Sequence, residues 1–98
     1  MTQLRGQITK RIRQKSKQVL GYEITSVELR LMPYIQYVMI NDQKLEPYKI
    51  NPEEREVLND WRNRGFIEGG AAGMKITKKF WDALSEILFL GYVDLSDE

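Results

Sequence analysis

The chain contains no cysteine and no histidine. Without cysteine, disulfide bonds and thiolate chemistry are excluded. Without histidine, the sequence lacks both the most common general base and the most common metal ligand. It also has no apolar run approaching the roughly 18 residues that a membrane-spanning helix needs. These absences favour functions that require few reactive groups.

The remaining composition is that of a globular protein. Apolar residues make up 42% of the 98 residues and charged residues 30%, which argues against disorder. A chain of this length builds one core, so we expect a single small domain over residues 1–98. The first residues lack an apolar signal core and soon become basic, which favours a cytoplasmic protein.

The net charge of +1 conceals a separation of charge along the chain. Residues 1–20 contain basic side chains and no acidic one, whereas residues 82–98 contain acidic side chains and no basic one. We therefore expect a basic N-terminal helix and an acidic C-terminal end at 94–98. Such segregation affects the choice of partner more than the fold.

Two kinds of periodicity divide the first half of the chain. Apolar residues at helical spacing predict a helix over 3–20, followed by Gly21 as its cap. Over residues 22–46 the alternation of apolar and polar side chains and the β-branched and aromatic content predict two strands, interrupted at Pro33, and a short returning strand at 44–46. These form a β-meander or a hairpin with a short third strand.

The second half, residues 52–90, predicts a helix, a hairpin and a second helix. Asn51 and Glu54 have the spacing of a capping box, and Pro52 suits the first helical position. A glycine-rich turn at 69–73 separates two short apolar pieces, and Thr77 can cap the last helix. The whole sequence predicts an α+β fold of order α-β-β-(β)-α-β-β-α, with helices packed on a small antiparallel sheet.

No catalytic, cofactor-binding or metal-binding residue emerges from these motifs. The glycines at 69–73 lack the Gly-Lys-Ser/Thr ending and the following helix of a phosphate-binding loop. The carboxylates at 53–60 fit the first turns of a helix better than a magnesium site. We therefore expect no enzymatic activity, no cofactor and no small-molecule substrate.

Basic residues on the N-terminal helix suggest a nucleic-acid-binding surface. Lys10, Arg13 and Lys17 share one face and could neutralise phosphates without reading sequence. The same face could bind an acidic protein surface or remain solvated. Membrane binding is disfavoured because the apolar stripe of this helix lacks bulky side chains.

The C-terminal helix carries more apolar side chains than one face can bury. Phe89, Leu90, Val93 and Leu95 are the candidates for a protein interface. Tyrosines 34, 37 and 48 are further candidates for a stacking or interface surface.

Residues 53–84 resemble the second half of a winged-helix DNA-binding domain. The segments that carry this resemblance are EEREVLNDWRNRGFIEGG, GMKIT and KKFWDAL. The family has two helices directly before its recognition helix, where we expect strands. The small size and unusual composition also resemble accessory proteins of phages or prophages.

The resemblance implies a recognition helix at 53–64 and a wing at Gly69–Gly73. It places Arg55, Asn59 and Arg62 on the outer side of that helix, where asparagine and arginine are suitable for reading base edges. Two hypotheses follow: a non-catalytic protein-interaction module that forms a homodimer or binds a partner, and alternatively a nucleic-acid-binding protein.

Overall fold

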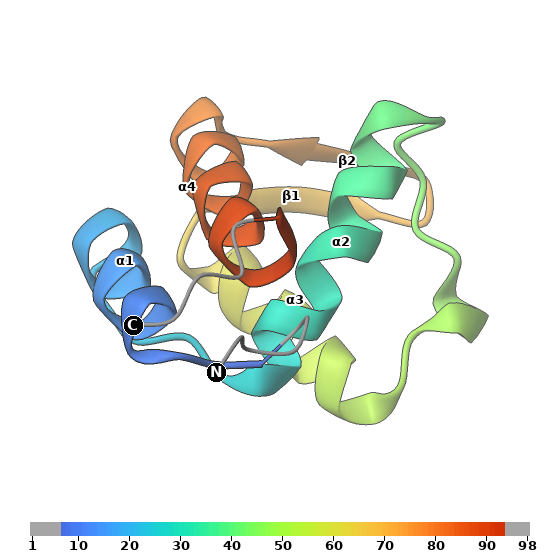
Figure 1. Cartoon of the computed structure of the whole chain (residues 1–98). Coiled ribbons are helices and arrows are strands. Elements are labelled where there is room, and N and C mark those ends of the chain that lie inside the picture. The colour runs from blue at the N-terminus through green and yellow to red at the C-terminus, as the bar shows by residue number, and fades with distance from the viewer. Residues whose placement is uncertain (1–6, 94–98) are drawn as a thin grey trace.

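The computed structural model describes residues 7–93 of the chain (Figure 1). The elements in chain order are α1 (Lys10–Leu20), α2 (Ser26–Ile40), a 3₁₀ turn η1 (Pro47–Lys49), α3 (Pro52–Asn63), β1 (Ile67–Gly70), β2 (Gly73–Ile76), α4 (Lys78–Leu88) and a π-helical turn η2 (Phe89–Val93). Within this described part, four α-helices and one two-stranded antiparallel sheet form a single compact domain, so the predicted α+β class is confirmed.

Helix α4 lies between α1 and α2 (Figure 1) and packs against both. Helix α3 packs against α2 and β1. The core draws on every α-helix and both strands, and Trp61, Phe80 and Leu84 are almost completely inaccessible to solvent. The Trp61 ring meets the Phe80 ring edge-on at 5.0 Å between centroids, and Phe66 stacks on Phe80 at 4.8 Å.

The predicted β-meander over residues 22–46 is wrong, because its centre is the helix α2. Thr25 caps this helix through a complete capping box with Glu28. The side chains that α2 buries recur every three or four residues, as Leu31, Ile35 and Val38 do. Burial of this face outweighs the β propensity of the segment and the proline in the helix interior.

Helix α1 is shorter than the predicted helix 3–20. It begins at Lys10, where the Thr9 side chain caps it, and Gly21 ends it with a left-handed backbone at φ 88°. Residues 7–9 precede the helix, and the rest of the predicted N-terminal extension, including Leu4 and Arg5, lies outside the described residues.

The helix–hairpin–helix segment agrees closely with prediction. Asn51 and Glu54 form the expected capping box of α3, and Thr77 caps α4. The hairpin pairs Ile67 with Ile76 and Gly70 with Gly73. The predicted end of the last helix at residue 90, before Gly91, is wrong, because α4 ends at Leu88 and the helical backbone continues as η2 through Gly91 to Val93.

The segment between α2 and η1 contacts the hairpin through its backbone. The Gln43 carbonyl accepts a hydrogen bond of 2.6 Å from the Met74 amide, and the Leu45 amide donates to the Gly70 carbonyl at 3.2 Å. This is the region of the predicted strand at 44–46, although it pairs too briefly to form one. The contact holds Leu45 beside the turn of the hairpin.

A polar cluster joins the α1–α2 connection, α2 and α3. The Glu28 side chain is only 6% exposed, and its Oε2 accepts hydrogen bonds from the Tyr22 hydroxyl at 2.5 Å and from Trp61 Nε1 at 3.0 Å. Its Oε1 accepts from the Thr25 amide at 3.0 Å. Burial raises the pKa of Tyr22 above its usual value, and Glu28 raises it further, so the tyrosine remains a donor.

Candidate binding surfaces

A hollow of about 280 Å³ lies between η1, α3 and the hairpin turn. We call it the arginine pocket. The residues that line it are Leu45, Pro47, Ile50, Arg55, Leu58, Asn59, Arg62 and Ala71. Three of them, Arg55, Asn59 and Arg62, are the residues that the winged-helix resemblance places on the outer side of α3. Their spacing of four and three residues puts them on one side of the helix.

Arg62 is held in place within the arginine pocket. Its Nε donates to the Gly69 carbonyl at 2.9 Å, and its Nη1 donates to Asn59 Oδ1 at 2.9 Å. A Cβ at Gly70 would lie 3.0 Å from Arg62 Nη2, so the absence of a side chain at this position lets the guanidinium pack closely over the strand. Arg55 is less constrained, with a hydrogen bond of 3.4 Å from Nη2 to the Pro47 carbonyl.

Two acidic residues of α3 are engaged elsewhere. Glu54 completes the capping box with Asn51, and the Asp60 carboxylate accepts a hydrogen bond from Arg64 Nε at 2.7 Å. Among residues 7–93, no carboxylate lines the arginine pocket. Within residues 7–93, no three side chains of the metal-binding types come close enough together to hold an ion.

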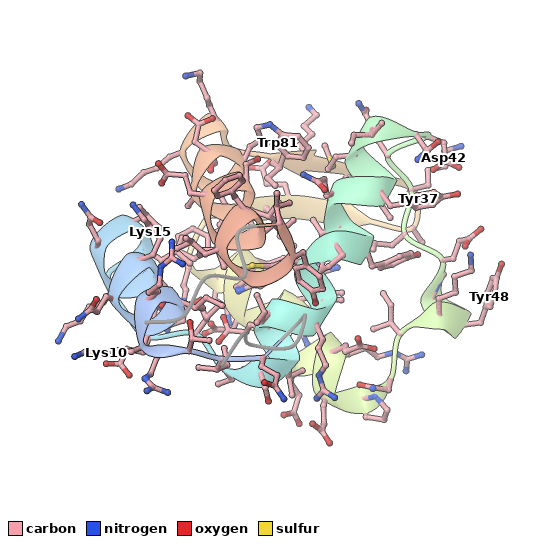
Figure 2. The ribbon with its side chains drawn as sticks, in the orientation of Figure 1. Lys10, Lys15, Tyr37, Asp42, Tyr48 and Trp81 are labelled. Carbon is pink, nitrogen blue, oxygen red and sulfur yellow. The ribbon has the colours of Figure 1, made fainter. Side chains whose placement is uncertain are left out.

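The cationic face of α1 forms a second surface. Lys10, Arg13 and Lys17 are exposed, as their predicted role requires, and Lys15 is half-buried. Figure 2 shows Lys10 and Lys15 at the opposite side of the molecule from Tyr37 and Tyr48. Helix α1 packs on α4 and η2, whereas α3 packs on α2 and β1. The six candidate nucleic-acid-binding residues therefore form two groups on different elements.

A third surface is a groove between α2 and the end of α4, with a volume of about 370 Å³. We call it the apolar groove. Its lining residues are Pro33, Gln36, Ser85, Leu88, Phe89, Tyr92 and Val93, none of which is charged. Phe89 is 52% exposed and Val93 is 69% exposed, large values for apolar side chains. Pro33 lines this groove because it lies on the helix α2. Its place there could not be predicted from the sequence, since the sequence pattern of this segment predicts strands.

The predicted interface residues do not all belong to this groove. Phe89 and Val93 line it, but Leu90 is half-buried and packs against the core. Residues 92–93 belong to η2, while Leu95 lies outside the described part of the chain.

The tyrosine candidates differ in their surroundings. The Tyr34 hydroxyl accepts a hydrogen bond from the Glu46 amide at 3.0 Å, so this ring is half-buried and serves the fold. Tyr37 is 57% exposed and Tyr48 is 79% exposed. Tyr48 lies on η1 and lines neither the arginine pocket nor the apolar groove.

No protein-family model, curated protein or solved structure matches the chain. Among residues 7–93, no helix combines the length and the apolar character that crossing a membrane requires.

Proposed function

We propose that the protein is a non-catalytic interaction protein that forms a homodimer through the apolar groove. The observation that carries this proposal is the exposure of Phe89 and Val93 at a hollow with an apolar rim. Complete burial of a fully exposed side chain of this kind contributes about 1.5–3 kcal/mol, and Phe89 and Val93 have 52% and 69% of their surface still to bury. A two-fold interface makes each contact twice, which doubles this contribution.

The lining of the groove suits a second copy of the same chain. A charged surface repels an identical surface, but every residue that lines this groove is uncharged at neutral pH. The half-exposed ring of Phe89 and the hollow that it lines lie on the same face of the molecule. In a two-fold contact, the Phe89 ring of one copy can enter the hollow of the other, and the reverse contact follows by symmetry.

Replacing Phe89 with aspartate is expected to produce a monomer. The change removes the projecting ring and would place a charge in each half of a buried interface, so we expect the dimer dissociation constant to rise by about 100-fold or more. Sedimentation velocity over a series of protein concentrations measures this constant. Because residue 89 is half exposed, the circular dichroism spectrum should remain that of the wild type.

Tyr48→Asp is the matched control, since it introduces the same charge at a more exposed aromatic residue outside the groove. This variant should dimerise like the wild type. A wild-type protein that sediments as a monomer at high concentration would contradict the proposal. A dimer that tolerates Phe89→Asp would contradict it equally.

A second candidate function is nucleic-acid binding. Two observations favour it: α1 and α2 precede α3, as helices precede the recognition helix of winged-helix domains, and Arg55, Asn59 and Arg62 gather beside the hairpin. Lys10, Arg13 and Lys17 would add phosphate contacts from α1. In this function the protein binds a nucleic acid and catalyses no reaction on it.

Changing Lys10, Arg13 and Lys17 together to glutamate is expected to abolish binding of a fluorescently labelled DNA duplex, measured by anisotropy. If each residue contacts one phosphate, these three contacts account for about three units of the wild-type slope of log affinity against log salt. The control changes Arg30, Lys78 and Lys79 to glutamate, because these exposed residues alter the net charge equally. No binding by the wild type at low salt would exclude this function, and both triple variants should still dimerise.

A further inference from the structure

The arginine pocket combines an apolar lining with two guanidinium groups. Leu45, Ile50 and Leu58 are each no more than 7% exposed, yet all three reach the wall of the hollow. Arg55 and Arg62 line the same space, and no acidic side chain in the described part of the chain does. A site that brings an apolar wall and unopposed positive charge together fits a ligand that has both an apolar and an anionic part.

Arg55 and Arg62 differ in how firmly hydrogen bonds hold their guanidinium groups. Arg62 is fixed by the hydrogen bonds to Gly69 and Asn59, so its position needs little reordering when a ligand binds. Arg55 has one long hydrogen bond to a carbonyl and therefore has donors to spare. Guanidinium groups pair with carboxylate and phosphate oxygens through two parallel hydrogen bonds.

The size of the hollow limits the ligand. A volume of about 280 Å³ is at or just below the lower end of the range of about 300–1,000 Å³ that is usual for small-molecule sites. We propose that the arginine pocket binds a small organic anion in which a carboxylate or phosphate is attached to one compact apolar group. This site shares no lining residue with the apolar groove, so it goes beyond the proposed dimer and does not depend on it.

Titration of the full chain with benzoate tests the proposal. Carbon–proton NMR spectra should show shifts of the methyl signals of Leu45, Ile50, Leu58 and Ala71. A ligand this small is expected to bind with a dissociation constant on the order of 1 mM. Benzamide lacks the charge and inorganic phosphate lacks the apolar group, so each should bind about tenfold more weakly or not at all.

Arg55→Gln should weaken benzoate binding about tenfold, because a charge-assisted hydrogen bond is lost. Arg13→Gln is the matched control: it removes one exposed arginine of α1, and binding should not change. Gly70→Ala offers an independent test, since its new Cβ would crowd Arg62 Nη2 and Leu45. It should weaken binding while the circular dichroism spectrum stays native.

Each contrary result overturns the proposal. One is the absence of methyl shifts at benzoate concentrations about tenfold above the expected dissociation constant. Others are equal binding by wild type and Arg55→Gln, shifts confined to Leu88 in the apolar groove, or phosphate binding as tight as benzoate binding. The last result would mean a simple anion site without an apolar component.

Discussion

Replacing Trp61 with alanine is expected to lower the free energy of unfolding by about 3–5 kcal/mol, the range for a completely buried large aromatic side chain. Trp61 has no exposed surface. The substitution removes its edge-on contact with Phe80 and the hydrogen bond from Nε1 to Glu28, and it leaves a cavity between α3 and α4. Urea denaturation followed by circular dichroism measures the change.

Trp81→Ala provides the comparison within the same protein. Trp81 is only half-buried, at the side of α4 labelled in Figure 2, so its loss should cost about 1 kcal/mol. Both variants delete the same atoms, and the difference between them therefore reports burial. Equal destabilisation by the two changes would show that Trp61 is not the centre of the core.

Replacing Glu28 with leucine is expected to cost about 2–4 kcal/mol of unfolding free energy, although the change places an apolar side chain in a buried position. The carboxylate accepts hydrogen bonds from the Tyr22 hydroxyl, Trp61 Nε1 and the Thr25 amide. The indole donor of Trp61 then keeps only its longer hydrogen bond of 3.3 Å to the Tyr22 hydroxyl, and α2 loses half of its capping box. Urea denaturation followed by circular dichroism measures this change in the free energy of unfolding.

Two further variants separate the causes of the Glu28 effect. Glu28→Gln keeps the shape of the side chain, but its amide nitrogen is a donor that faces another donor, either Trp61 Nε1 or the Thr25 amide. The free energy of unfolding of this variant should therefore lie between those of the wild type and Glu28→Leu. Glu23→Leu changes an exposed carboxylate in the same connection and should leave the free energy of unfolding within about 0.5 kcal/mol of the wild type. A Glu28→Leu protein as stable as the wild type would show that the hydrogen bonds of this carboxylate contribute little to the free energy of unfolding.

The second half of the fold could be predicted from sequence because its signals are local. The Asn51–Glu54 capping box, the glycines of the hairpin and the Thr77 cap each determine the backbone within a few residues. The end of α4 could not be predicted in this way. Gly91 lies close to Leu29 and Ile12, and this tertiary packing accompanies the π-helical continuation past a residue that usually ends a helix.

The helix α2 was missed although the sequence contains evidence for it. Thr25 and Glu28 have the capping-box spacing, and Leu31, Ile35 and Val38 have helical spacing. Local β propensity and Pro33 favoured strands instead. The sequence does not reveal that α3 and α4 bury the face of α2 on which apolar residues recur every three or four positions. This burial decides between the helical and the strand pattern.

The candidate surfaces were predictable only where one helix supplies them. The spacing of Arg55, Asn59 and Arg62 on α3 brings them together without any knowledge of the fold. The apolar wall of the arginine pocket depends on the approach of Leu45 to the hairpin, a contact between segments distant in sequence. Likewise, Phe89 and Val93 were identified from excess apolarity, but Pro33 joins them only through the packing of α2 on α4.

The glycine in η2, Gly91, lies where three helical elements meet. A side chain at Gly91 would meet the Cδ1 atoms of Leu29 at 3.3 Å and of Ile12 at 3.5 Å, so α1, α2 and η2 converge at one backbone position. A close-packed interior leaves no slack at such a junction. A Cβ at Gly91 would therefore crowd Leu29, so the glycine is what allows η2 to approach α1 and α2 this closely.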